Sequence, residues 1–287
     1  MPYLLVHNPS SGSGAEDLPT RAKRELNDVR TLQLDPGTDL GSEIGAALEE
    51  GRTVVACGGD GTVNAVAQHM AGTGGLMAVL PGGTLNHFAR DLGIADADAA
   101  FATLTRGETT RIDVGRADER VFVNNLGFGI YPEVVREREQ DDHRFGRRVA
   151  LAASVVRVAI SFDPLEGRIA ADGRARELEA TAVFVGNNRF STSPGSIGRR
   201  HRLDEGVLDV RVVRSRVGLV GRASAGWRAA VSRPRRVVRT VAHEVEVRLR
   251  EPRLMAVDGE QDGEHRSIRI KVDPGALQIL VPQAADG

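Results

Sequence analysis

The sequence has very little cysteine and no surplus of charge. Cys57 is the only cysteine among 287 residues, which excludes an intramolecular disulfide and suits a reducing compartment. Its place in an apolar run favours a small buried residue over a nucleophile. The formal net charge of −1 gives no overall field for nucleic acid, so we expect no nucleic acid partner.

Long apolar runs are also missing. No run reaches the roughly 20 residues that span a bilayer. The apolar run at residues 3–6 follows no basic region and is too short for a signal peptide. We therefore expect a cytoplasmic protein without a transmembrane segment. Peripheral contact with the inner membrane face stays open, but it would have to be local because the net charge is so small.

Up to about residue 110, apolar runs of strand length alternate with segments of helical spacing. This alternation predicts an α/β domain at residues 1–112 with a mainly parallel sheet. The strands are expected at residues 3–6, 31–34, 53–57 and 76–80, and the helices at 18–29, 44–48, 63–70 and 97–104.

Beyond a boundary between Thr110 and Val114, apolar residues recur at every second position. This period is typical of antiparallel strands with one solvated face. It predicts a β-sandwich domain at residues 113–287. The alternating segments are residues 177–185, 207–213, 244–250, 268–272 and 277–281.

Helical stretches are expected to interrupt the β-rich part at residues 133–160 and 217–241. The second is basic and contains Trp227. We favour a helix that covers the sandwich with a solvated arginine face. A helix that lies on an anionic membrane surface is the alternative.

Three predicted strands end in turns of small polar residues. The central one, Thr53 to Cys57, runs into Gly58-Gly59-Asp60-Gly61-Thr62 and then into a helix. Glycines let the backbone approach a ligand, and the free N–H groups of the helix start favour an anion, most often phosphate. Comparable turns follow the other two strands, at residues 7–14 and 81–90. Because the ends of parallel strands line one crevice, these turns predict a phosphate-binding site.

The motifs Asn8-Pro9-x-Ser11-Gly12, Gly58-Gly59-Asp60-Gly61-Thr62 and Pro81-x-Gly83-Thr84-x-Asn86 resemble the catalytic domain of the diacylglycerol and sphingoid-base lipid kinases. The likeness continues through Leu203-Asp204-Glu205-Gly206 and Asp258-Gly259-Glu260. It is strongest to the soluble bacterial diacylglycerol kinase-like proteins, and the glycine-aspartate motif is shared with the NAD kinases. The expected fold is therefore an NAD kinase/diacylglycerol kinase-like α/β domain followed by the sandwich, with the last residues returning to the first domain.

The resemblance implies ATP and Mg²⁺ as cofactors. Within it, Asp258 matches the proposed general base and Glu260 its neighbour, while Asp60 is the rival base. The residues expected to bind the nucleotide are Asn8, Ser11, Gly12, Gly58, Gly59, Asp60, Gly61, Thr62, Asn64, Gly83, Thr84 and Asn86.

The resemblance also implies a structural magnesium ion. Its expected ligands are the side chain of Glu205, where the family has Asp, and the carbonyls of Arg202 and Val207. Two other positions depart from the family pattern, because Ser13 and His87 stand where the bacterial enzymes usually have Lys and Asp. The paired loss of one positive and one negative charge leaves no charge stranded.

The leading functional prediction is an ATP-dependent lipid kinase that acts at the membrane surface. It would phosphorylate a primary hydroxyl, of diacylglycerol by default, to give phosphatidic acid. One alternative is a kinase for a sphingoid base or another hydroxylated small molecule. The other is a non-catalytic regulator that binds a nucleotide or a lipid. The sequence leaves the oligomeric state open, a homodimer included.

Overall fold

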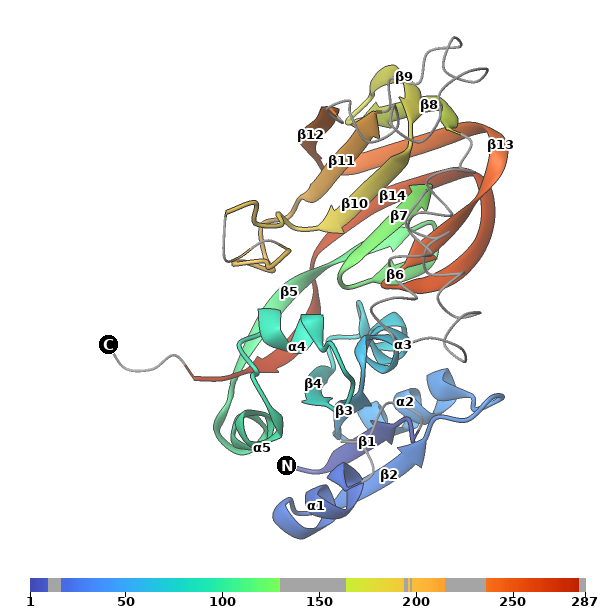
Figure 1. The fold of residues 1–287 in the computed structure, drawn as a ribbon. Coiled ribbons are helices and arrows are strands. Elements are labelled where there is room, and N and C mark those ends of the chain that lie inside the picture. Colours follow the sequence, from blue (N-terminus) through green and yellow to red (C-terminus); the bar gives the residue numbers. More distant parts are fainter. Residues whose placement is uncertain (10–16, 130–163, 194–195, 197, 215–235, 284–287) are drawn as a thin grey trace, which may run out of the picture. The chain divides into compact units, whose positions relative to one another are not determined.

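The computed structural model describes residues 1–9, 17–129, 164–193, 196, 198–214 and 236–283 (Figure 1). The chain divides into two compact units. Unit 1 consists of Met1–Asn124, Asn187–Gly206 and Val272–Gly287, and unit 2 of Asn125–Gly186 and Val207–Lys271. The division is less simple than the expected boundary between Thr110 and Val114, because unit 1 takes up two later segments.

The sheet of unit 1 is parallel, as predicted. Its strands are β1 (Tyr3–His7), β2 (Val29–Gln33), β3 (Thr53–Gly58), β4 (Leu76–Pro81) and the last part of β14 (Glu260–Val281). They lie in the order β14-β4-β3-β1-β2, and neighbouring strands in this order are parallel. Strand β3 is buried along its whole length, which explains its continuous apolar run.

Five helices are described in unit 1: α1 (Leu18–Glu25), α2 (Leu40–Glu49), α3 (Asp60–Met70), α4 (His87–Asp91) and α5 (Ala97–Arg106). Asp39 and Asp96 cap α2 and α5 by accepting hydrogen bonds from backbone N–H groups. The prediction of a helix through residue 29 is wrong at its end. Leu26 is already extended and Val29 opens β2, so the apolar period there belongs to two elements.

The remaining strands of unit 1 are β5 (Glu108–Ala117) and β6 (Arg120–Phe122), an antiparallel pair. Unit 2 contains β7 (Asn125–Gly129), β8 (Leu165–Ala171), β9 (Arg174–Ala180), β11 (Leu208–Arg214), β12 (Arg236–Ala242), β13 (Glu244–Val257) and almost all of β10 (Ala182–Asn187).

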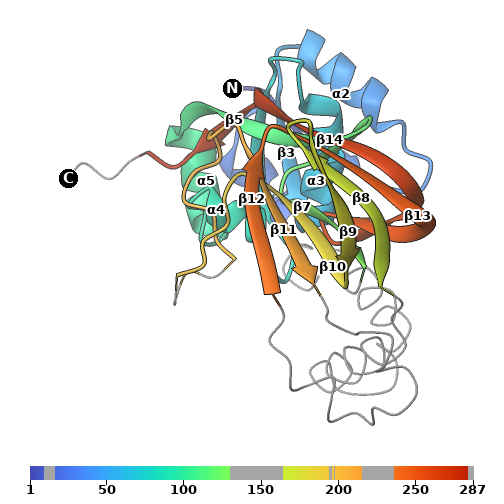
Figure 2. The same ribbon diagram turned by 90° about the horizontal axis from the view of Figure 1, so that it is seen from above.

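The strands of unit 2 pair antiparallel in two groups, which confirms the predicted sandwich. Strand β13 belongs to both groups, because its first half pairs with β8 and its last residues pair with β7. The register of β13 against β14 shifts between Arg248 and Arg253, and such an irregularity bends a strand. From above, β11 and β12 lie side by side, as do β8 and β9 (Figure 2).

Three predictions for the β-rich part need correction. The alternating segment 177–185 is divided between β9 and β10 at Thr181, whose N–H donates to the Val213 carbonyl at 2.8 Å. Residues 268–281 lie within one strand, β14. The helix expected to run to residue 241 is wrong over residues 236–241, which form most of β12 because they pair with β11. Residues 217–235, with Trp227, and the predicted helix at 133–160 lie outside the described residues.

Within the described ranges, no helix combines the length and the apolar character needed to cross a bilayer.

Cys57 is completely buried, and this burial raises the pKa of its thiol to about 12. Because the thiolate is the nucleophile, the expectation that Cys57 is an inert core residue is confirmed.

Asp113 in β5 joins the separate segments of unit 1. It is 2% exposed. Its carboxylate accepts hydrogen bonds from Gly206 N at 2.6 Å and Gly275 N at 2.9 Å, and its own N–H donates to the Leu203 carbonyl at 2.7 Å. Asp113 thus holds a loop and the last strand against the strand that follows α5.

We expect Asp113→Ala to lower the free energy of unfolding by about 3 kcal/mol, because two hydrogen bonds to a charged acceptor are lost. Urea unfolding followed by circular dichroism measures this, with Glu108→Gln, an exposed acid of the same strand, as the control. Equal stability of the two variants would show that the Asp113 contacts contribute nothing.

Candidate phosphate-binding site

The glycine turn after β3 leads directly into a helix, as predicted. Gly58 ends β3, Gly59 is the N-cap of α3, and Asp60 is its first residue. The N-terminal turn of this 11-residue helix has backbone N–H groups without partners in the helix and carries the positive end of its dipole. These features favour an anion next to Gly59 and Gly61.

A second turn, after β4, packs directly against the first. Gly82 N donates to the Gly58 carbonyl at 2.9 Å. A Cβ atom added to Gly83 would lie 2.5 Å from Gly59 Cα and 2.9 Å from Asn86 Oδ1. The two turns therefore meet backbone to backbone, and Gly83 is required because no side chain fits between them.

Asn86 closes the second turn. It has a left-handed backbone with φ of 47°, which Asn adopts more easily than most residues. Its side chain accepts a hydrogen bond from Gly83 N at 3.0 Å and donates one to the Gly83 carbonyl at 2.7 Å. Asn86, which we predicted to bind the nucleotide, thus shapes the turn through its side chain.

Asp60 ties the two turns together. One carboxylate oxygen accepts from His87 N at 3.2 Å and the other from Phe88 N at 3.1 Å. Both N–H groups belong to the first turn of α4, so Asp60 caps that helix from another element. His87 itself is exposed. Through these hydrogen bonds Asp60 fixes the start of α4 relative to the start of α3.

The other predicted nucleotide-binding residues differ in accessibility. Thr84 is exposed at the second turn, whereas Thr62 and Asn64 are 3% and 2% exposed. Asn64 donates from Nδ2 to the Val121 carbonyl at 3.0 Å, which links α3 to β6. The side chains of Thr62 and Asn64 therefore lie beneath the turn, inside the unit.

The first predicted turn is described only at its start. Asn8 follows β1, and its N–H donates to the Cys57 carbonyl at 3.4 Å, so it lies beside the end of β3. Burial and then the charge of Lys23 lower the pKa of His7, while Asp35 opposes this shift. Ser11, Gly12 and Ser13 lie outside the described residues.

One residue near the site was not found by sequence reasoning. The Arg200 side chain is fully buried and forms an ion pair with Asp91, at the end of α4, at 2.7 Å. It also donates to Asn124 Oδ1 at 2.6 Å and to the Asn187 carbonyl at 3.2 Å. The sequence around it, Arg199-Arg200-His201, is typical of an exposed polar segment. It therefore does not indicate that Arg200 is buried and paired.

Asp258 and Gly259 form the turn of the β13–β14 hairpin in unit 2. Their φ angles are 48° and 89°, and Val257 pairs with Glu260 across the turn. Positive φ at both central residues is the requirement of a type I′ turn, for which Asp-Gly is a preferred pair. Asp258 Oδ1 also accepts from Asn125 N at 2.8 Å. Glu260 is exposed at the start of β14.

The carboxylate of the predicted magnesium ligand is engaged by an arginine. Glu205 Oε1 lies 3.0 Å from Arg189 Nη1, and Oε2 accepts from Arg189 N at 3.1 Å. Arg202 pairs through its side chain with Asp204 at 3.0 Å, and Val207 is buried in unit 2. Among the described residues no cluster of three His, Cys, Asp or Glu could hold a metal. The expected site, one carboxylate with two main-chain carbonyls, is of a different kind, and Glu205 as a magnesium ligand stays a prediction.

Comparison with known families divides the chain in two. Residues 2–117 match the diacylglycerol kinase catalytic domain. Residues 128–281 match the YegS C-terminal NAD kinase beta sandwich-like domain. The two matches follow the change from an α/β to a β-rich pattern along the sequence.

Individual relatives match over most of their length. A Pseudomonas aeruginosa protein named "Probable lipid kinase YegS-like" is 29% identical over 97% of this chain and 93% of its own. A Bacillus subtilis protein named diacylglycerol kinase is 26% identical over 76% of this chain and 74% of its own. The crystal structure of a Bacillus anthracis diacylglycerol kinase covers 98% of this chain and 97% of its own, with a TM-score of 0.65 at 21% identity, and supports the fold.

We expect Arg200→Met to lower the free energy of unfolding by about 3–5 kcal/mol, because it leaves the buried Asp91 carboxylate without its partner. The double variant Arg200→Met/Asp91→Leu should recover much of this loss, since no charge is then left unpaired. Urea unfolding of the three proteins measures the coupling. A double variant less stable than Arg200→Met alone would contradict the assignment.

Proposed function

Because the chain belongs to the lipid kinase family that joins a diacylglycerol kinase catalytic domain to a YegS-type β-sandwich domain, we propose that it transfers the γ-phosphate of ATP to a lipid hydroxyl. The default acceptor is the primary hydroxyl of diacylglycerol, which would give phosphatidic acid. The observation that carries the proposal is the contact of the Gly59 and Gly83 turns at the ends of β3 and β4.

The two turns suit the phosphates of a nucleotide. Neither Gly59 nor Gly83 presents a side chain, so phosphate oxygens can approach the backbone N–H groups at the start of α3 closely. The start of α3 adds its dipole, and Thr84 adds an exposed hydroxyl. In this proposal Asp60 and Asn86 hold the turns in position rather than contact the transferred phosphate.

Transfer also requires a group that receives the proton of the attacking hydroxyl. The hydroxyl oxygen forms a bond to the γ-phosphorus, the bond to the β–γ bridging oxygen breaks, and ADP leaves with that oxygen. We assign the proton to the carboxylate of Asp258, with Glu260 two residues further along the chain. Mg²⁺ bound to the ATP phosphates would neutralise charge that develops on them.

The type I′ turn also supports a second candidate. The Asp258-Gly259 pair is accounted for by the geometry of the hairpin, and Glu205 is paired with Arg189. A protein that binds a nucleotide or a lipid without transferring phosphate would keep both features.

Incubation with labelled ATP, Mg²⁺ and a lipid extract separates the candidates, because only the kinase produces a labelled lipid. Sphingoid bases and other hydroxylated acceptors are tested in the same assay, with vesicles and soluble acceptors as separate arms.

We expect Gly83→Ala to lower kcat/KM for ATP by about 100-fold, because its Cβ would push the two turns apart and misplace the phosphates. Gly45→Ala in α2 is the control, since no atom lies within 4 Å of a Cβ added there. Initial rates over a range of ATP concentrations measure the effect. An unchanged kcat/KM for ATP in Gly83→Ala would show that the two turns do not bind the phosphates.

We expect Asp258→Asn to lower kcat by about 10²–10⁴-fold with little change in ATP affinity, because the general base is lost. The substitution is informative since Asn-Gly also forms type I′ turns and Asn keeps an oxygen that can accept from Asn125 N. Steady-state kinetics, ATP titration and urea unfolding of the variant test this. Unchanged kcat would leave Asp258 with its role in the turn alone.

A further inference from the structure

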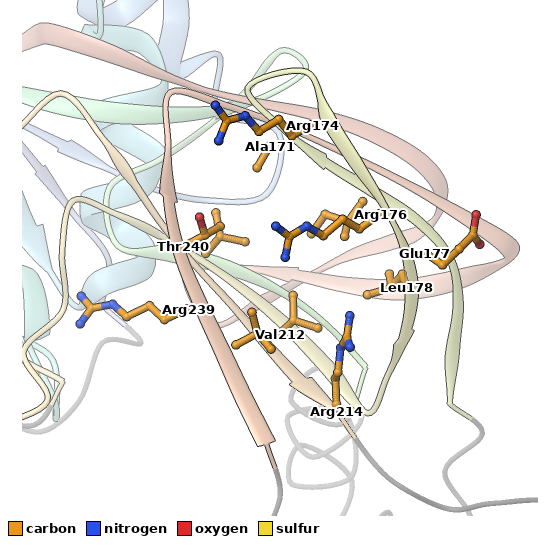
Figure 3. Close-up of a pocket in the computed structure, with 12 residues that line it drawn as sticks. Ala171, Arg174, Arg176, Glu177, Leu178, Val212, Arg214, Arg239 and Thr240 are labelled. Carbon is orange, nitrogen blue, oxygen red and sulfur yellow. The ribbon is translucent and has the colours of Figure 1, made fainter.

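The sandwich of unit 2 contains a cavity that the proposed phosphate transfer does not use. It has a volume of about 250 Å³ and lies between the β8–β9 and β11–β12 strand pairs (Figure 3). Its apolar wall includes Ile169, Leu178, Val210, Val212 and Val238. Leu178 and Val210 are 3% and 1% exposed, so the cavity reaches the apolar interior of the sandwich.

Four arginines also line this cavity, and three of them continue its apolar faces. In β9, Leu178 and Ala180 are buried, and the alternation of the strand places Arg176 and Arg174 on the same face. In β11, Val210 and Val212 are followed on the same face by Arg214. Positions that would be apolar in a closed sandwich are therefore arginine at this end.

Three of these arginines carry charges that no other described side chain neutralises. Arg174, Arg176 and Arg214 form no hydrogen bond or ion pair with any side chain in the part of the chain that the structure describes. Two other charged residues at the cavity have partners elsewhere. Glu177 pairs with Arg168 at 3.0 Å, and Arg239 pairs with Asp209 at 2.7 Å.

Figure 3 shows the difference between the arginines without partners and the charged residues that pair elsewhere. The guanidinium groups of Arg176 and Arg214 extend into the space between the strand pairs, whereas the side chains of Glu177 and Arg239 point away from it. Like charges that line one cavity without a counter-charge repel one another, and an anion bound there reduces this cost. An apolar wall beside them favours a hydrocarbon chain.

We propose that this cavity binds a single-chain anionic amphiphile. The hydrocarbon chain lies against Leu178, Val210 and Val212, and the phosphate or carboxylate head lies between Arg176 and Arg214. Guanidinium groups hold such heads through paired, charge-assisted hydrogen bonds. The volume lies below the about 300–1,000 Å³ of common ligand pockets, so one chain fits better than a two-chain lipid.

The proposal is tested by isothermal titration of the full chain without nucleotide, at amphiphile concentrations below micelle formation. The probes are decyl phosphate, decanoate, decanol and inorganic phosphate. We expect decyl phosphate or decanoate to bind at one site per chain. Decanol and inorganic phosphate should bind at least about tenfold more weakly, because decanol has no anionic head and inorganic phosphate has no hydrocarbon chain. Equal binding of inorganic phosphate or of decanol, or no saturable binding, would overturn the proposal.

Variants assign the binding to this cavity. Arg176→Gln and Arg214→Gln should each weaken binding of the anionic amphiphile by about tenfold or more. Ala171→Phe should weaken it by filling the cavity, with urea unfolding as the check on its fold. Arg168→Gln is the matched control, because Arg168 lies on the other face of β8 and pairs with Glu177. Equal effects of Arg168→Gln and Arg176→Gln would place the binding elsewhere. Because no nucleotide is present, the result is independent of the proposed kinase activity.

Discussion

The contact between two stretches of bare backbone, at Gly59 and Gly83, is the constraint on which the candidate site depends. A Cβ at Gly83 would approach Gly59 Cα to 2.5 Å, so the ends of β3 and β4 come this close only because neither turn carries a side chain there. At Gly59 the bare backbone also lets an anion approach the N–H groups at the start of α3, whereas Gly82 N and Gly83 N already donate to the Gly58 carbonyl and to Asn86 Oδ1. One choice of residue therefore serves both the packing of the turns and the recognition of phosphate.

Glycine turns are flexible in themselves, and polar side chains restrict them here. Asn86 holds Gly83 from both its N–H and its carbonyl. Asp60 connects the start of α3 to the start of α4, and Arg200 fixes the other end of α4 through Asp91. The short helix α4 is thus held at both ends by charged side chains from other elements. This arrangement gives the second turn a fixed position beside the first without any side chain at the point of contact.

Sequence reasoning succeeded where a local pattern determines the structure. The buried strand β3, its glycine turn and α3 follow from an apolar run, small residues and helical spacing, and the strands of unit 2 follow from period two. Predictions from the sequence failed where residues far apart in the chain determine the structure. Residues 236–241 form a strand because β11 pairs with them. The roles of Asp113 and Arg200 depend on residues more than 70 positions away, which no local pattern encodes.

At Glu205 a carboxylate expected from the family to bind magnesium has a contact with an arginine of the same chain. A magnesium ion prefers hard, negatively charged oxygen ligands, and a carboxylate that is already paired with a cation offers it less negative charge. In this chain Arg189 contacts both oxygens of Glu205, one through its side chain and one through its backbone N–H. The guanidinium supplies the positive charge that a metal would have supplied and repels a second cation. The loop before Gly206 is held by this ion pair together with the Asp113 contact.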